Sequence, residues 1–136
     1  MIEFDSRVDV EIDISPLEAI ASFLSKKQVE LILTDDDEMR ALNKERRGVD
    51  APTDVLSFPI ADFPLSPLGS IVISIGAAQK QADTLKHDLA SEIAVLFLHG
   101  MLHLLGMDHE TDNGEMAARE KRLRKRFNLP IALTER

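Results

Sequence analysis

The chain has 136 residues, a length that suits one compact domain and is too short for two. Hydrophobic residues make up 44% and charged residues 29%, so intrinsic disorder is not expected. The net charge of −8 disfavours a protein whose whole surface binds nucleic acid, but it is compatible with a local basic cleft. The absence of cysteine excludes disulfide scaffolds, zinc ribbons and thiol catalysis, so any metal must be held by imidazole and carboxylate groups.

Hydrophobic spacing predicts short strands in the first half of the chain, at 29–34, 54–58 and 71–73. In the first of these, Val29, Leu31 and Leu33 alternate with the other residues, which predicts one buried and one exposed face.

Helices are predicted before, between and after these strands. Ser15 is placed to cap the first helix, with Pro16 at its first position. Asp88 can cap a long apolar helix that runs to Leu105 and is ended by Gly106. The other predicted helices run from aspartates 35–37 to about Arg46, Arg47 and Gly48, from 77 to 85, and from a cap at Asp112 or Asn113 through an apolar face of Met116, Leu123 and Phe127.

This order of elements predicts an α+β fold: a single compact domain over residues 1–136, with a small mixed β-sheet packed against several helices. The long central apolar helix carries the candidate metal ligands. The first residues lack the pattern of a signal peptide, and the most apolar window, 93–107, falls short of the roughly 20 residues that span a bilayer. A cytoplasmic protein without membrane contact is therefore expected.

Three of the four histidines lie within residues 99–109. His99 and His103 are four residues apart, so they share one helix face, and Gly106 lets the chain turn back so that His109 supplies a third ligand. A single histidine on an apolar helix is more often a core residue, but a chance match to this spacing has a probability of about 0.001. Three imidazoles leave a tetrahedral position open for water, which is typical of a catalytic zinc. We expect one Zn²⁺ per chain.

The spacing matches the H-E-x-x-H-x-x-G-x-x-H pattern of metzincin proteases, except that Gly100 replaces the glutamate that acts as general base. Asp108 or Glu110 could substitute for that base, but neither lies on the helix face beside His99. The histidines therefore indicate a metal-dependent hydrolase, and the missing glutamate disfavours a protease.

The sequence resembles the YbeY family of bacterial endoribonucleases in three ordered blocks. The segment from His99 to His109 is similar to the family signature H-G-x-L-H-L-x-G-x-D-H at every fixed position. The segment from Leu42 to Pro59 resembles L-N-x-x-[aromatic]-R-x-K-D-x-P-T-D-V-L-S-F-P, and the segment from Leu68 to Ser74 resembles L-G-D-I-x-I-S.

The resemblance implies a zinc-dependent, single-strand-specific endoribonuclease that acts in ribosomal RNA maturation, notably at the 3′ end of the small-subunit RNA, and in ribosome quality control. It implies single-stranded RNA, ribosomal RNA and ribosomal particles as partners. By motif position it implies zinc ligands at His99, His103 and His109 and a cleft arginine, tied to activity, at Arg47. A guanidinium that contacts phosphate agrees with that role, although an arginine that merely ends a helix is common.

Three positions depart from the family pattern. Arg46 stands where an aromatic residue is usual, Val49 where lysine is usual and Ser70 where aspartate is common. The loss of the aspartate puts one polar partner of the site in doubt, and Arg46 could offset the lost lysine in contact with RNA.

Predictions can also be made for Asp108, His87 and the basic residues of the last helix. Asp108 could orient a ligand histidine or shape the turn after Gly106. His87 is expected at the surface, at a helix start. A basic run on the last helix is a solvated face or a patch that meets RNA phosphate; it comprises Arg119, Lys121, Arg122, Arg124, Lys125 and Arg126.

Two other function classes stay open beside the endoribonuclease. One is a metallopeptidase, disfavoured by Gly100 and by the lack of a distinct motif for a strand edge that holds a substrate backbone. The other is a non-enzymatic ribosome-associated factor with a structural zinc, disfavoured by the open coordination position and the acidic composition.

Overall fold

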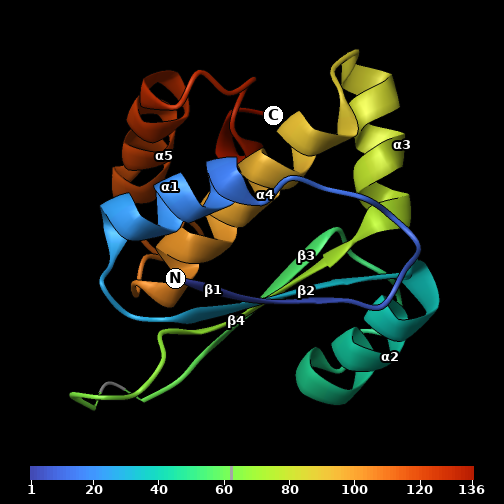
Figure 1. Cartoon of the computed structure of the whole chain (residues 1–136), viewed down its shortest axis with the longest axis horizontal. Coiled ribbons are helices and arrows are strands. Elements are labelled where there is room, and N and C mark those ends of the chain that lie inside the picture. The colour runs from blue at the N-terminus through green and yellow to red at the C-terminus, as the bar shows by residue number, and fades with distance from the viewer. Residues whose placement is uncertain (62) are drawn as a thin grey trace.

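The structure, a computed structural model, describes residues 1–61 and 63–136. Within these residues it consists of four strands, five α-helices and one short 3-10 helix (Figure 1). In chain order they are β1 (Ile2–Ser6), α1 (Ser15–Leu24), β2 (Val29–Thr34), α2 (Asp36–Arg47), β3 (Val55–Pro59), β4 (Gly69–Ser74), α3 (Ile75–Leu85), α4 (Leu89–Leu104), α5 (Glu115–Arg126) and η1 (Leu133–Glu135).

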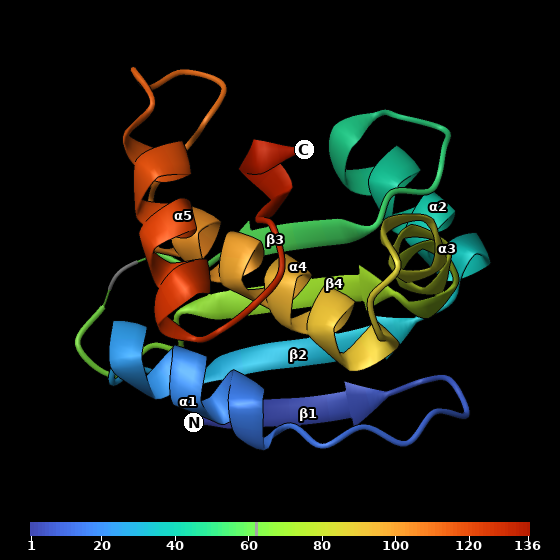
Figure 2. The same cartoon turned by 90° about the horizontal axis from the view of Figure 1, so that it is seen from above.

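The four strands form one mixed sheet in the order β1-β2-β4-β3 (Figure 2). β1 and β4 both run parallel to β2, whereas β3 runs antiparallel to β4. The α+β prediction, with a small mixed sheet, is confirmed. β1 was not predicted, and its short run Ile-Glu-Phe-Asp-Ser has only one buried residue, Ile2.

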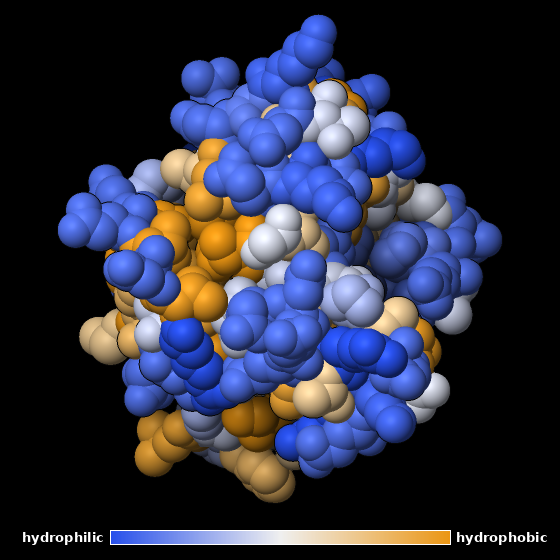
Figure 3. Space-filling view, turned by 90° about the vertical axis from the view of Figure 1, so that its right-hand side faces the viewer, coloured by the Kyte–Doolittle hydropathy of each residue, from blue (hydrophilic) through white to orange (hydrophobic). Residues whose placement is uncertain are grey.

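Helices cover both faces of the sheet. α2 lies on one face, and α1, α3, α4 and α5 lie on the other (Figure 1). Hydrophilic side chains predominate on the side that carries α2 and α3, as expected for helices that bury only one face (Figure 3). Among the described residues, no helix has the length and apolar character needed to cross a membrane.

β2 is buried on both faces, so the prediction of an exposed face was wrong. Ile32 packs with Met39 of α2, Leu56 and Val72 in a small second core on the α2 side, and Thr34 is also buried. The residues do alternate between the two faces of β2, but α2 covers the face that was predicted to be exposed to solvent. A sheet with helices on both faces leaves no water-exposed side on its central strands.

α4 crosses the middle of the sheet and is buried almost all round, as predicted for the long apolar helix (Figure 2). The Asp88 side chain caps it by accepting a hydrogen bond from Ser91 N at 2.8 Å. The helix ends at Leu104, and Gly106 follows with φ of +94°. This left-handed conformation suits glycine and turns the chain back toward the helix.

Two predicted helix caps differ in the structure. Ile14, not Ser15, occupies the cap of α1, and the Ser15 backbone N–H donates to the Asp13 carboxylate. At α5 the cap is Gly114 in a left-handed conformation, while Asp112 still accepts a hydrogen bond from Met116 N at 2.9 Å.

Candidate metal centre and its cleft

The last two turns of α4 and the loop that follows bring three imidazoles together. His99 and His103 lie one turn apart on the same helix face, and the turn at Gly106 returns His109 beside them. One ring nitrogen from each residue lies within 4.8 Å of the others. The structure thus gathers the three histidines singled out in the sequence; their role as metal ligands stays a prediction.

Two of the imidazoles are fixed from behind through Nδ1. His99 Nδ1 lies 2.8 Å from Glu120 Oε2, and His103 Nδ1 lies 2.9 Å from the backbone carbonyl of Met107. A carboxylate and a carbonyl only accept hydrogen bonds, so Nδ1 carries the proton on both rings. Each ring therefore turns an Nε2 lone pair toward the cleft, the arrangement that metal-binding histidines use.

The two Nε2 atoms of His99 and His103 lie 3.1 Å apart. If both carry lone pairs, this contact is repulsive unless a cation lies against both atoms. Burial, and then the neighbouring His99, lower the pKa of His103, which keeps the Nε2 lone pair of that ring available to a metal ion. The donor set therefore fits a metal ion that prefers imidazole nitrogen.

Glu120 was missed by sequence reasoning. It lies on α5 within the basic run and is fully buried, and its other oxygen accepts a hydrogen bond from Thr134 N at 3.1 Å. Its position was a usable signal, because residues 116, 120, 123 and 127 follow helical spacing on one face and the other three are apolar. An acidic residue in an apolar stripe indicates a buried partner.

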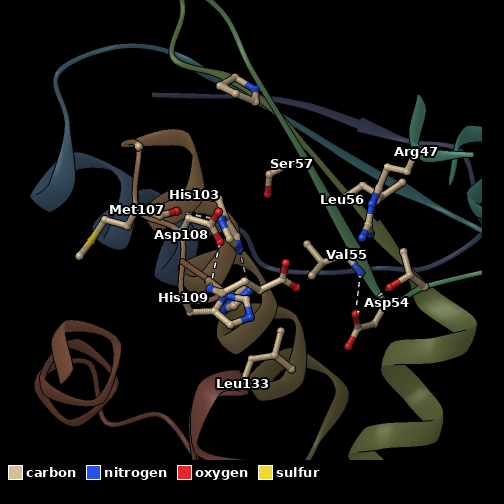
Figure 4. A pocket seen from close by; sticks show the side chains of 15 residues that line it. Arg47, Asp54, Val55, Leu56, Ser57, His103, Met107, Asp108, His109 and Leu133 are labelled. Atoms are coloured by element: carbon tan, nitrogen blue, oxygen red, sulfur yellow. Dashed lines mark hydrogen bonds between the residues drawn. The ribbon is translucent and has the colours of Figure 1, made fainter. Parts of the chain in front are cut away.

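An open cleft of about 510 Å³ lies in front of the histidines. Its walls are the end of α4, the loop that carries His109, strand β3 and Leu133 of η1 (Figure 4). Asp54 and Ser57 also line it.

Arg47 lines the same cleft, on the wall across from the histidines (Figure 4). It is the last residue of α2, which Gly48 ends with φ of +71°, and its side chain is exposed. No described carboxylate forms an ion pair with it, whereas Arg40 pairs with Asp50 at 2.7 Å. Its guanidinium is therefore free to meet an anion in the cleft.

Comparison with known proteins identifies the family. The model of the family "Endoribonuclease YbeY" matches residues 10–128. A protein of that name from Nautilia profundicola is 55% identical over 136 residues, covering all of this chain and 98% of its own length. The protein of that name from Wolinella succinogenes is 52% identical over all of this chain and 97% of its own length. The one from Helicobacter pylori strain Shi470 is 50% identical over all of this chain and 98% of its own length.

The chain belongs to the YbeY family. The fold agrees: the solution structure of TM1509 from Thermotoga maritima matches with a TM-score of 0.67 and 28% identity, over 93% of this chain and 89% of that one. The family assignment made from the three sequence blocks is confirmed.

Gly100, where metzincins carry their base, faces the sheet and not the cleft. A Cβ at this position would meet three side-chain carbons of Ile71 in β4 at 3.0 to 3.1 Å. The glycine lets α4 pack closely on the sheet. A glutamate there would have to displace a buried isoleucine before reaching any substrate.

The departures from the YbeY pattern lie outside the cleft. Ser70 donates a hydrogen bond to Glu30 on the neighbouring strand at 2.8 Å and does not line the cleft. The Arg46 guanidinium lies over the Phe58 ring at 5.5 Å, and Val49 is exposed. None of the three replacements therefore removes a described partner of the histidines.

Asp108 shapes the turn and holds no described histidine ring. Its Oδ1 accepts a hydrogen bond from Glu110 N at 3.0 Å, and its carbonyl accepts from the backbone N–H groups of Thr111 and Asp112. The positions behind the rings of His99 and His103 are taken by Glu120 and the Met107 carbonyl.

The basic run of α5 does not line the cleft. Arg124 makes a two-pronged contact with Glu135 at 2.7 and 2.9 Å, and Arg126 lies over the Phe23 ring at 4.2 Å. These intramolecular contacts favour a role of the basic run in holding the fold together over a role in binding RNA phosphate at the cleft.

His87 was expected at the surface, and this was wrong. Its Nε2 lies 2.7 Å from Glu92, a fully buried carboxylate that Arg136 also contacts through two nitrogens. His87 lies just before α4, at a helix start as predicted, and helps to satisfy the buried charge of Glu92 in the first turn of that helix.

Proposed function

We propose that residues 1–136 form a single domain that cleaves single-stranded RNA at one zinc ion held by His99, His103 and His109. The proposed task is ribosomal RNA processing in the cytoplasm, notably at the 3′ end of the small-subunit RNA, together with ribosome quality control on ribosomal particles. Membership of a family whose members are named endoribonucleases supports the reaction class.

The observation that carries the proposal is the pairing of three converging imidazoles with an unpartnered arginine across one cleft. Imidazole ligands suit zinc, and three of them leave a position of a tetrahedral site for substrate or water. A phosphodiester can use both groups, because its oxygens can contact a metal ion and accept paired hydrogen bonds from a guanidinium.

The chain's own residues divide the work as follows. Glu120 and the Met107 carbonyl hold the His99 and His103 rings with Nε2 toward the cleft. When bound, the ion supplies positive charge and Lewis acidity. Arg47 donates paired hydrogen bonds to phosphate oxygens and stabilises the charge that develops on them.

A metallopeptidase is the second candidate, and one observation favours it. β3 is an edge strand beside the histidines, a feature that no distinct motif in the sequence indicated. Peptidases bind substrate backbones along such edges. The hydrogen-bonding groups on this edge, described below, do not suit a peptide.

Histidine substitutions test the proposal. We expect the purified protein to hold about one zinc and to cleave a single-stranded ribosomal RNA fragment, and His99→Ala/His103→Ala to lose both. His87→Ala is the matched control, because this histidine lies outside the cleft and its loss should leave zinc content unchanged. Stoichiometric zinc in the double variant, or turnover of generic peptides by the natural protein, would overturn the proposal.

A further inference from the structure

The free edge of β3 can be worked out from its pairing with β4. Bonds from Ser74 N to the Asp54 carbonyl and from Ile60 N to the Leu68 carbonyl flank the ladder and continue its register. In an antiparallel pair, alternate residues exchange both backbone hydrogen bonds with the partner strand. The even residues of β3 therefore point their backbone groups at β4, and Val55, Ser57 and Pro59 point theirs away from the sheet.

This edge is rich in acceptors and poor in donors. The Val55 N–H is already taken by Asp54 Oδ1 at 2.9 Å (Figure 4). Pro59 has no N–H. Of these three residues, only Ser57 therefore has a backbone N–H without a described partner. The carbonyls of Val55, Ser57 and Pro59 all point outward, and no described donor contacts them.

The same three residues line the cleft that contains the histidines and Arg47. The Ser57 hydroxyl adds a group that can accept as well as donate. Its described bond, to the Gly100 carbonyl, is 3.5 Å long, at the limit of hydrogen-bonding distance. A ligand in the cleft can therefore form a hydrogen bond with this hydroxyl and replace the bond to Gly100 at little cost in free energy.

A peptide strand is a poor occupant of this edge, because it needs alternating donors and acceptors to pair. A ligand with hydroxyl donors at regular intervals fits better. The carbonyls of Val55, Ser57 and Pro59 recur about every 6.8 Å, twice the rise per residue of a strand. Successive nucleotides of an extended RNA strand can match this spacing, and each carries a ribose 2′-hydroxyl that DNA lacks.

We propose that the open edge of β3 recognises the ribose 2′-hydroxyls of the bound strand and so makes the cleft select RNA over DNA. The carbonyls of Val55, Ser57 and Pro59 accept hydrogen bonds from these hydroxyls, and the Ser57 side chain adds one contact. This inference rests on the proposed function, since it assumes that a single nucleic acid strand occupies the cleft.

RNA substrates with a change at a single ribose test whether the edge of β3 recognises 2′-hydroxyl groups. Single-turnover cleavage by the zinc-loaded protein is measured on one RNA sequence with 2′-deoxy or 2′-fluoro groups placed at one nucleotide at a time. We expect both changes to slow cleavage by roughly three- to tenfold at two or three nucleotides beside the cleaved bond, because neither group donates a hydrogen bond. The nucleotide whose own 2′-hydroxyl adjoins the cleaved phosphate is left out, since that hydroxyl could be the nucleophile.

A protein variant connects the effect to β3. In Ser57→Ala, the penalty for a 2′-deoxy group should shrink at one nucleotide and persist at the others, because only one contact has been removed. Ser70→Ala is the matched control: its hydroxyl bonds Glu30 outside the cleft, so every penalty should stay unchanged.

Binding gives a readout that does not need cleavage. Unlabelled DNA strands compete with a fluorescent DNA strand, and those with three consecutive ribonucleotides should bind at least about threefold tighter than all-DNA or 2′-fluoro versions. If the protein preferred strands with ribonucleotides but cleaved no RNA, the proposed function would be wrong and this inference would be supported. Equal cleavage of all ribose variants, rescue by 2′-fluoro, or equal effects in the Ser57→Ala and Ser70→Ala proteins would overturn the inference and leave the endoribonuclease standing.

Discussion

Glu120 is the residue on which the orientation of the candidate metal centre most depends. Its fully buried carboxylate lies between His99 and Thr134 of η1, so one side chain joins α4, α5 and η1. A buried carboxylate behind a ligand histidine fixes its tautomer and raises its basicity.

We expect Glu120→Gln to weaken zinc binding by about 10- to 100-fold, because the neutral amide no longer supports the His99 ring as a ligand. Competition with a chelator of known affinity measures this. Glu92→Gln is the control: Glu92 is equally buried but holds Arg136 and His87, so that variant should lose stability and keep its zinc affinity. Unchanged affinity in Glu120→Gln would show that the contact is structural only.

Arg47 separates phosphate electrostatics from metal binding. Arg47→Ala should keep its zinc content and melting temperature, since the side chain is exposed and has no described ion-pair partner. Loss of a preorganised charge donor should cost about 3 kcal/mol, or roughly a hundredfold in single-turnover RNA cleavage. Arg47→Lys should recover only part of the rate, because an ammonium lacks paired donor geometry. Equal rates in all three proteins would make Arg47 an ordinary arginine at a helix end.

At the scale of elements, the close contact between α4 and β4 sets the position of the histidines. Gly100→Ala should lower the free energy of unfolding, because overpacking against Ile71 costs about 1–3 kcal/mol and outweighs the gain of about 1 kcal/mol in helix propensity. Urea unfolding measures the change. In the control Gly76→Ala, the new Cβ meets only the Asp36 carboxylate, at 3.3 Å, and little loss is expected. A more stable Gly100→Ala protein would contradict the packing described here.

The docking of η1 on α5 should depend on pH. The Arg124 guanidinium, followed by the Ala132 N–H, lowers the pKa of Glu135 from 4.5 to about 2. The unfolded chain therefore takes up this proton first as the pH falls. The stabilisation by Glu135 is complete above about pH 4.5 and disappears as the pH approaches 2.

Thermal unfolding of the natural protein and Glu135→Gln between pH 7 and pH 2.5 tests this dependence. The natural protein should be the more stable one at pH 7, and the difference between the two should narrow below pH 4.5. A difference that stays constant over the whole range would show that Glu135 gains nothing from ionisation in the folded protein.

At the scale of the whole molecule, local patterns predicted the fold class, the long helix and its Asp88 cap, and the histidine cluster. These features depend on residues close together in the chain. The burial of Ile32, the partner of His87 and the carboxylate behind His99 depend on elements that meet only after folding. The edge position of β3 likewise follows from strand order, which no short pattern carries.

Zinc titration tests the central claim, a three-histidine zinc centre that cleaves RNA. Zinc is added in steps to metal-free protein while the rate of single-stranded RNA cleavage is followed. The rate should start near zero and reach its plateau at about one zinc per chain, and His99→Ala/His103→Ala should show no rise. Full cleavage by the metal-free protein, or the same rise in the double variant, would contradict the claim.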